Sequence, residues 1–303
     1  MPRPLLVGVQ LPEVEYEVPF DELIEMARTA ERIGLDSIWL GDHLLYDLAN
    51  GARGPHEVWT SLAALAAVTE RVQLGPLVAS TGFHAPAMLA KQAATVDAIS
   101  NGRLVLGLGA GWNRREYTAF GFPFDRRVSR LKEAFTIVRT LLRDGHIDVH
   151  GEFHRLEDCV LHPPPVTPGG PPLMVGSIGP RMLSITLPHV DMWNVWWSDY
   201  GNTPEGFAAV KAGVDAAAEA AGRAPHDVTA TCAVYVQLLG GGGRPMGDYP
   251  AGPTEPLRGT PNELADQLRS FAHAGAAHVQ LVVDPITRSS IESLAEVLAD
   301  LDR

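Results

Sequence analysis

The chain has 303 residues, 46% of them hydrophobic and 20% charged, so it can bury one large core or two of average size. Its formal net charge of −12 argues against nucleic-acid binding, because a surface that follows phosphates needs clustered Lys and Arg. The longest apolar stretches, such as residues 61–68, fall short of the roughly 20 residues of a membrane-spanning helix. We therefore expect a soluble protein with neither a nucleic acid nor a membrane as partner.

The cellular location is predicted from the N-terminus and the cysteines. Residues 5–11 are apolar but too short for a secretory signal, and they lack its small-residue cleavage pattern. Cys159 and Cys232 are too far apart for a local metal knuckle or a redox CxxC motif, so we expect each to be a small buried hydrophobe. A reduced, cytoplasmic setting fits this usage.

Short runs rich in Val, Ile and Leu alternate with longer segments whose apolar residues recur at helical spacing. The predicted strands are residues 5–11, 37–41, 72–79, 104–108, 173–176, 192–195, 229–238 and 278–283. The predicted helices are residues 20–33, 58–69, 87–99, 127–142, 180–187, 205–221, 262–274 and 289–301. This strict alternation predicts an α/β fold, a closed (β/α)8 TIM barrel, rather than an open doubly wound sheet.

Two segments interrupt the alternation. Residues 145–172 are rich in Pro, Gly and His, and residues 239–259 contain a tetraglycine and four prolines. We expect both to be loop insertions that act as lids or dimer contacts. Because the alternation resumes after each of them, we expect residues 1–303 to form a single domain.

The first insertion carries histidines at intervals of four, His146, His150 and His154. On a helix these side chains would form a stripe of metal ligands. Gly145 and Gly151 argue against a continuous helix here, so we expect a β-hairpin-like excursion and no metal site.

Reactive groups of a βα barrel follow the carboxyl ends of its strands, which makes residues 42 and 43 candidates. His43 could donate or accept a proton near neutral pH, with Asp42 orienting or charging the site. A structural histidine bonded to a backbone carbonyl is the alternative. We take Asp42 and His43 as the candidate catalytic residues.

Glycines follow two further strands. In VLGLGAGW, residues 105–112, the third glycine comes one residue too early for a dinucleotide-binding GxGxxG motif. We interpret this segment as a strand whose small residues let a flat ring approach the backbone, with Trp112 in the pocket wall.

The second glycine-bearing segment is MVGSIGP, residues 174–180, which leads into a helix that begins with Pro180. Backbone amides exposed there, together with the helix dipole, would hold a phosphate without any basic patch. A plain tight turn is the alternative. After the next strand, at least one of Trp193, Trp196 and Trp197 is expected to line the cavity.

Several blocks, taken in order, resemble the bacterial luciferase-like superfamily and its F420-dependent oxidoreductase branch. They are DSIWLGDHL (36–44), VQLGPLVAST (72–81), DAISNGRLVLGLGAGWNRREYTAFGFPF (97–124), PPLMVGSIGPRML (171–183) and VDMWN (190–194). Each block alone is weak, but the combination is specific and the likeness covers nearly the whole chain.

The resemblance implies a barrel with insertions that holds a flavin or the deazaflavin F420 across its mouth, with a non-proline cis peptide at Leu77–Val78. It also implies a homodimer, and it matches His43 to a position that often faces the reactive carbon of the ring. The phosphate is expected near Gly176, Ser177 and Gly179. The candidate cofactor-binding residues are Gln10, Leu77, Val78, Ser80, Gly109, Trp112, Asn113, Gly176, Ser177, Ile178, Gly179 and Trp193.

The acid–histidine pair resembles the F420-dependent branch more than the oxygen-activating branch, and a composition rich in Ala, Gly and Arg suits the GC-rich genomes where F420 is common. We therefore predict an F420-dependent oxidoreductase that transfers a hydride to or from a small organic substrate. The alternative is an FMN-dependent luciferase-like monooxygenase.

Two alternatives come from other classes of protein. The eleven histidines suggest a metal-dependent barrel hydrolase, but such a site needs ligands at several strand ends and only the second strand clearly supplies a His. A non-catalytic flavin-binding protein would keep the fold and lack the activity.

Overall fold

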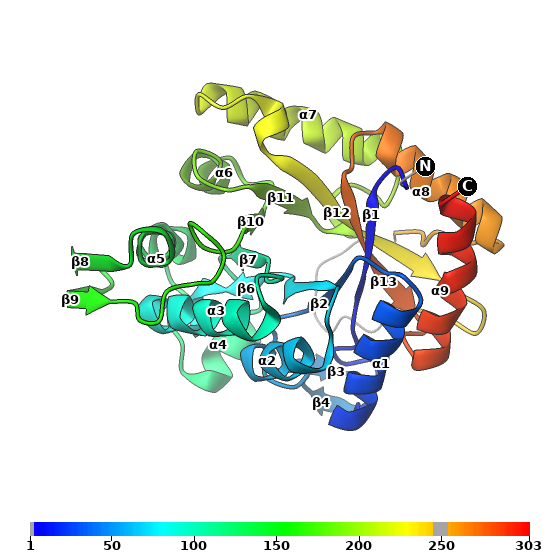
Figure 1. Ribbon diagram of the computed structural model, residues 1–303, viewed down its shortest axis with the longest axis horizontal. Helices are drawn as coiled ribbons and strands as arrows, with labels where there is room; N and C mark the ends of the chain where they lie inside the picture. The colour runs from blue at the N-terminus through cyan, green and yellow to red at the C-terminus, as the bar shows by residue number, and fades with distance from the viewer. Residues whose placement is uncertain (1–2, 245–253) are drawn as a thin grey trace.

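The computed structural model describes residues 3–244 and 254–303, and its main sheet is a parallel barrel (Figure 1). The strands follow the order β5-β2-β1-β13-β12-β11-β10-β7-β6, and a parallel bridge between Leu74 and Leu104 closes the ring. Their bounds are β1 Leu6–Gln10, β2 Ser37–Leu40, β5 Gln73–Pro76, β6 Ala79–Ser80, β7 Leu106–Gly109, β10 Leu173–Gly176, β11 Met192–Val195, β12 Thr229–Gln237 and β13 His278–Asp284. The predicted TIM barrel is confirmed, with its third strand divided into β5 and β6.

Helices cover the outside of the barrel, and every helix predicted from the sequence is present (Figure 1). Their bounds are α1 Phe20–Arg32, α2 Val58–Val68, α3 Pro86–Ser100, α5 Arg127–Asp144, α6 Pro180–Thr186, α7 Pro204–Ala220, α8 Pro261–His273 and α9 Arg288–Leu301. One further helix, α4 (Arg114–Phe120), was not predicted, because its two turns lie in a polar segment without apolar periodicity. The Asn113 side chain caps its first turn and Gly121 ends it in a left-handed conformation.

The break in the third strand is the cis peptide expected at Leu77–Val78. It lies between β5, which pairs with β2, and β6, which pairs with β7. The chain therefore bends at the point where it reaches the mouth of the barrel.

The first insertion forms the expected hairpin, with β8 (His146–His150) antiparallel to β9 (Arg155–Val160). A second hairpin, β3 (Tyr46–Leu48) with β4 (Gly51–Arg53), follows β2 and was not predicted. In the other insertion, residues 239–244 and 254–259 are described, and the remainder of that expected loop lies outside the described residues.

Three further expectations concern metal, membrane and cysteines. Within residues 3–244 and 254–303, no group of three His, Cys, Asp or Glu side chains is placed to hold a metal ion. The helices of the same part of the chain include none with the length and apolar character to span a bilayer. Cys232 is buried as expected, whereas Cys159 on β9 is only half-buried.

The amino end of the barrel is tied by the SNGR segment. Asn101 and Gly102 both have positive φ and turn the chain out of α3. Arg103 then donates hydrogen bonds to the carbonyl oxygens of Ala66, Thr69, Val72 and Ser100. One guanidinium thus joins the ends of α2 and α3 on the face opposite the mouth.

A buried polar layer fills the barrel near this end. Trp39 Nε1 donates to Ser37 Oγ at 2.7 Å, and Ser37 Oγ lies 2.7 Å from His278 Nε2. Burial lowers the pKa of His278 to about 4, so the imidazole is neutral in the folded protein.

Candidate active site

A cavity of about 280 Å³ opens at the carboxyl ends of the strands, the face where βα barrels carry their sites. Segments at or after the carboxyl ends of seven barrel strands contribute to its wall. The predicted site residues that line it are Asp42, His43, Leu77, Val78, Ser80, Gly109, Trp112, Gly176 and Ser177. Trp196 also lines it, as expected of one of the three tryptophans around β11.

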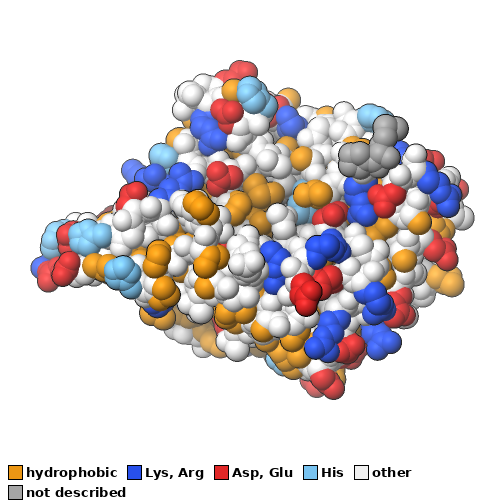
Figure 2. Space-filling model, in the orientation of Figure 1, with side chains coloured by type: hydrophobic (Ala, Val, Ile, Leu, Met, Phe, Trp, Pro, Cys, Tyr) orange, Lys and Arg blue, Asp and Glu red, His pale blue; other side chains and the backbone are white. Residues whose placement is uncertain are grey.

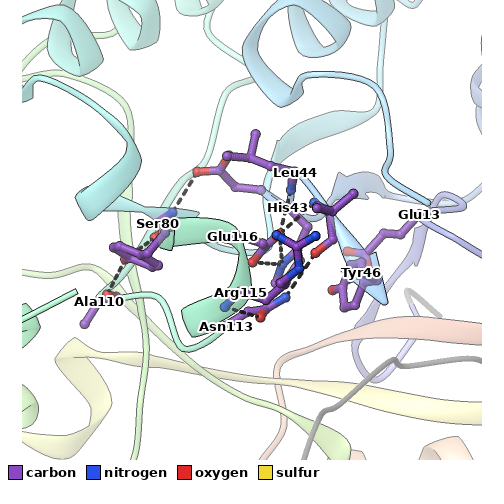
Figure 3. Close-up of polar contacts among 12 residues, drawn as sticks. Glu13, His43, Leu44, Tyr46, Ser80, Ala110, Asn113, Arg115 and Glu116 are labelled. Atoms are coloured by element: carbon purple, nitrogen blue, oxygen red, sulfur yellow. Dashed lines mark hydrogen bonds and ion pairs between the residues drawn. The ribbon is translucent and has the colours of Figure 1, made fainter. Parts of the chain in front are cut away.

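His43 is held by a carboxylate that the sequence did not reveal. Glu116 on α4 is buried, and each of its two oxygens lies 3.1 Å from His43 Nδ1. Oε1 also accepts hydrogen bonds from the backbone amides of Leu44 (2.6 Å) and Leu45 (3.2 Å). Figure 3 shows His43 and Glu116 facing one another, so Nε2 is the imidazole nitrogen left for the cavity.

Two opposing effects act on the pKa of His43. Burial alone would lower it, because a buried imidazolium loses hydration. The hydrogen bond to Glu116 and the negative charges of Glu13, Glu116 and Asp42 outweigh burial and hold the pKa above the usual 6.5. His43 therefore keeps its proton through neutral pH more readily than a free histidine.

The side chains of Asp42 and His43 bond different residues, as expected of adjacent side chains that point to opposite faces of a strand. Asp42 Oδ2 accepts hydrogen bonds from the Ser80 amide (2.8 Å) and from His84 Nε2 (2.7 Å). The carboxylate therefore joins the end of β2 to β6 and the turn that follows. Asp42 lines the cavity, but its bonds make it an organiser of the third strand rather than a direct partner of His43.

The glycines of β7 and β10 make room for Val78. A Cβ built on Gly109 would lie 2.7 Å from Val78 Cγ2, and one on Gly176 would lie 3.0 Å from it. On Gly107 a Cβ would lie 2.8 Å from Val78 Cγ1. The interpretation that these glycines admit a flat ring directly is therefore corrected: they admit Val78, which itself forms part of the cavity wall.

Gly111 is required by a buried hydroxyl network. Tyr117 Oη lies 2.8 Å from Ser80 Oγ and donates to the carbonyl oxygen of Ala110 at 2.9 Å. A Cβ on Gly111, whose φ is +72°, would lie 2.1 Å from that hydroxyl. This contact fixes the loop that carries Trp112.

An ion cluster that sequence reasoning missed closes another side of the cavity. Arg244 is almost fully buried and bonds Glu13 (Nη2 to Oε2, 3.0 Å) and Glu15 (Nε to Oε1, 2.7 Å). Its guanidinium lies 5.4 Å from the centre of the Trp196 ring. The two carboxylates raise the pKa of Arg244 further despite its burial, so the cation is permanent.

Several predicted cofactor-binding residues lie outside the cavity wall. Trp193 is buried behind it and donates from Nε1 to the Ser177 carbonyl at 2.7 Å. Gln10 donates to Glu13 Oε1 at 2.7 Å, and Asn113 donates to the Leu45 carbonyl at 3.1 Å. Their positions support the wall rather than form it.

The fifth loop departs from the open cradle expected there. Gly179 N donates to Ser177 Oγ at 3.1 Å, so one of the amides meant for a phosphate has an internal partner. Ile178 is 44% exposed and faces a hollow outside the mouth. Ser177 and Gly176 remain the members of this loop that line the cavity.

The fold is a TIM barrel, and its cavity lies at the carboxyl ends of the strands, where enzymes of this fold carry their active sites. The profile of the family described as luciferase-like monooxygenase matches residues 5–238. The chain therefore belongs to the luciferase-like monooxygenase family.

The names of the curated relatives describe two different reactions, an F420-dependent dehydrogenation and a monooxygenation. The F420-dependent glucose-6-phosphate dehydrogenase of Amycolatopsis mediterranei is 34% identical over 164 residues, 52% of this chain and 48% of that protein. The pyrimidine monooxygenase RutA of Methylorubrum extorquens is 33% identical over 227 residues, 71% of this chain and 58% of that protein. The chain thus spans about half the length of the curated relatives it matches.

Solved structures show the same fold at low identity. An F420-dependent secondary alcohol dehydrogenase, in complex with an F420–acetone adduct, gives a TM-score of 0.80 at 19% identity and covers 99% of both chains. The EDTA monooxygenase EmoA of Chelativorans sp. BNC1 gives 0.79 at 15% identity, covering 98% of this chain and 93% of that one.

Proposed function

We propose that this chain is an oxidoreductase that binds F420 at the mouth of its barrel and acts on a small organic substrate. The observation that carries the proposal is the His43–Glu116 pair, a buried carboxylate that holds an imidazole against the wall of the mouth cavity. Such a pair provides a proton donor and acceptor near neutral pH.

The residues of the cavity fit a flat ring system. Val78, Trp112, Met182, Val195 and Trp196 give it apolar walls. Its volume of about 280 Å³ is close to the lower end, about 300 Å³, of small-molecule sites, so a ring fits inside while a longer cofactor extends outward. Gly176 and Ser177 are the residues we propose to meet the phosphate side.

When bound, F420 supplies two-electron hydride transfer. In alcohol oxidation, the substrate carbon loses a hydride and its hydroxyl loses a proton, and His43 Nε2 takes that proton. In the reverse direction, protonated His43 donates to the carbonyl oxygen. Glu116 fixes the imidazole and stabilises its charged form, while Trp112 and Tyr46, whose rings pack beside His43, restrict water.

Turnover by a His43→Ala variant tests this role. We expect cofactor affinity to stay within about twofold, while kcat falls by about 10²–10⁴-fold, as general acid–base catalysis implies. His226→Ala, at an exposed histidine, is the matched control and should keep full activity. An unimpaired rate in His43→Ala would remove this residue from the mechanism.

The FMN-dependent alternative has its own support, because the RutA match covers more of this chain than the F420-dependent match does. Calorimetric titration of the purified protein with F420 and with FMN under the same conditions separates the two. We expect F420 to bind at least tenfold more tightly. A preference for FMN would make the monooxygenase the better assignment.

The remaining alternatives and properties have direct tests. Stoichiometric zinc in the purified protein would favour the barrel hydrolase, and tight cofactor binding without turnover of any carbonyl or alcohol would favour a non-catalytic binding protein. We propose that residues 1–303 fold as a single domain and act in the cytoplasm as a homodimer. Light scattering measures the oligomeric state.

A further inference from the structure

Among the described residues, the acidic side chains that line the mouth cavity differ in whether the protein supplies a basic partner. They are Glu13, Asp42, Glu116 and Asp199. The basic partners of the first three, in the same order, are Arg244, His84 and His43. Within residues 3–244 and 254–303, the Asp199 carboxylate has neither a hydrogen bond nor an ion pair. The cavity therefore holds one negative charge that the described side chains leave without a counterion.

The surroundings of Asp199 differ from those of many acids on the outer surface. Figure 2 shows acidic side chains beside basic ones over much of the face it draws, and the exposed pair of Arg28 with Glu25 is an example of such a contact. Asp199 instead faces a cavity whose described cation, Arg244, already bonds two carboxylates. A bound cation would supply the counterion that these side chains do not.

Asp199 is exposed to the mouth, yet the walls around it displace part of the water that would hydrate its carboxylate. This loss of hydration raises the pKa of Asp199 above the usual 3.8. The charged carboxylate is therefore less stable here than in water. A cation placed beside it would restore this stabilisation, and would do so more effectively than at a fully hydrated surface.

The fold places Asp199 opposite the candidate catalytic histidine. Asp199 ends the short turn η2 (Trp197–Asp199), which follows β11, and its amide donates to the Trp196 carbonyl at 2.9 Å. His43 follows β2. Around the ring, β1, β13 and β12 separate these two strands on one side, and β10, β7 and the divided third strand separate them on the other. A molecule in the cavity can therefore present one group to His43 and another to Asp199.

The walls of the cavity suit an organic cation. Tyr46, Trp112 and Trp196 line it with aromatic rings. Trp196 precedes Asp199 by three residues, and its ring already has the Arg244 guanidinium 5.4 Å from its centre. Because the faces of aromatic rings attract cations, an alkylammonium group would gain from the rings as well as from the carboxylate.

We propose that Asp199 determines substrate specificity by binding an ammonium group, and that the substrate is a small alcohol or carbonyl compound that carries this group away from its reacting carbon. The inference rests on the proposed function, because it takes the hydroxyl or carbonyl group to be the one that faces His43. The ammonium group serves recognition and takes no part in the transfer of hydride or proton. A substrate with a carboxylate or phosphate in its place would meet a like charge and bind poorly.

Binding of three probes of similar size to the purified protein tests the charge preference without turnover. The probes are butylammonium, butanol and butanoate, and ligand-detected NMR measures their dissociation constants. We expect butylammonium to bind about tenfold more tightly than butanol, the scale of one hydrogen bond to a charged group, and butanoate to bind least tightly. High salt should reduce the preference for the cation.

Two variants each remove one negative charge. In D199N the amide keeps the size of the side chain, and the preference for butylammonium over butanol should vanish. D144N is the matched control, because Asp144 is exposed at the end of α5 and lies outside the cavity wall, so this variant should keep the preference. Equal binding of the two probes to the wild type, or no measurable binding of butylammonium, overturns the proposal. A preference that persists in D199N overturns the assignment to Asp199.

Turnover separates this inference from the proposed function. With cofactor bound, the matched substrates are aminobutanol, pentanol and hydroxybutanoate, each with its hydroxyl on a secondary carbon. We expect kcat/KM for aminobutanol to exceed that for pentanol by about tenfold, and D199N to close this gap mainly through KM. A higher kcat/KM for pentanol or hydroxybutanoate overturns the proposed substrate class. If none of the three is turned over with F420 or FMN while butylammonium still binds through Asp199, the result counts against the proposed function and leaves the role of Asp199 standing.

Discussion

At the scale of single residues, the function depends on how His43 is charged. Burial and nearby carboxylates oppose one another, and the carboxylates prevail. Glu116 contributes both a hydrogen bond and a charge, so it is the residue to alter when this balance is tested.

A Glu116→Gln variant should move the pH profile. Gln keeps an oxygen for the amides of Leu44 and Leu45 but removes the charge, so burial then lowers the pKa of His43. The limb of kcat/KM that requires protonated His43 should shift to lower pH. Glu219→Gln, on the exposed face of α7, is the control, and an unmoved limb in Glu116→Gln would contradict the assigned pair.

The buried His278 should make the stability of the fold sensitive to acid, independently of catalysis. Its pKa is about 4 when folded and about 6.5 when unfolded, so between these values the unfolded chain binds a proton that the folded chain excludes. The free energy of unfolding should therefore fall by about 1.4 kcal/mol per pH unit from pH 6.5 to 4, in total about 3 kcal/mol. Urea denaturation at several pH values measures this.

The matched comparison is between two histidines. His278→Gln should flatten the fall in stability over that range, whereas His226→Gln, at an exposed position, should leave it unchanged. If the two variants lose stability with the same slope as the wild type, burial of His278 is not the cause.

Some site residues could be predicted and others could not. Asp42 and His43 were found because they directly follow a predicted strand, where a barrel places its chemistry. Glu116 lies in a short helix without apolar periodicity, and Glu13 and Arg244, which bond one another, are 231 residues apart. No local pattern marks such a pair, because tertiary structure alone brings its members together.

At the scale of elements, the break in the third strand organises the mouth. Val78 follows the break and occupies space that three glycines on β7 and β10 leave open. Sequence alone indicated small residues at these positions but not what fills the space beside them.

A Gly109→Ala variant tests this packing. The added Cβ would come within 2.7 Å of Val78, so the wall must shift, and we expect a loss of about 1–3 kcal/mol in the free energy of unfolding together with weaker cofactor binding. Gly213→Ala on α7 meets no atom within 4 Å and should instead stabilise the protein by about 0.5–1 kcal/mol. Urea denaturation measures the free energy of unfolding of both variants, and titration measures their cofactor affinity. If Gly109→Ala and Gly213→Ala changed both quantities equally, Gly109 would have no special role in packing against Val78.

Helices and strands with strong periodicity were predicted within a few residues. The helix α1 buries Leu23, Ala27 and Ala30, three of the apolar residues whose spacing predicted it, and Met26 beside them. Short elements such as β3 and β4 escaped prediction, since three-residue strands carry too few residues to establish a period.

At the scale of the whole molecule, the two ends of the barrel have different roles: the amino end carries stabilising contacts and the carboxyl end carries the cavity. The alternation of strands and helices was enough to predict the closed barrel, because few other arrangements satisfy it. Arg103 ties loops at the amino end, far from the cavity, so its loss should affect folding and spare binding.

An Arg103→Met variant should lower the free energy of unfolding by about 2–4 kcal/mol, because it removes charge-assisted hydrogen bonds and leaves partly buried carbonyl oxygens unpaired. Cofactor affinity should stay within twofold. Arg155→Gln, on the exposed hairpin, is the control for urea denaturation and calorimetry. A large loss of affinity in Arg103→Met would show that the two ends of the barrel are coupled.

The six tryptophans have a practical consequence for following the protein in solution. Trp112 and Trp196 line the cavity, whereas Trp39, Trp59, Trp193 and Trp197 are buried away from its wall. A bound chromophore would quench the emission of the first two indoles most strongly, because they lie nearest to it. The protein therefore carries its own optical reporter of occupancy, and replacing Trp112 with Phe would show how much of the signal arises beside His43.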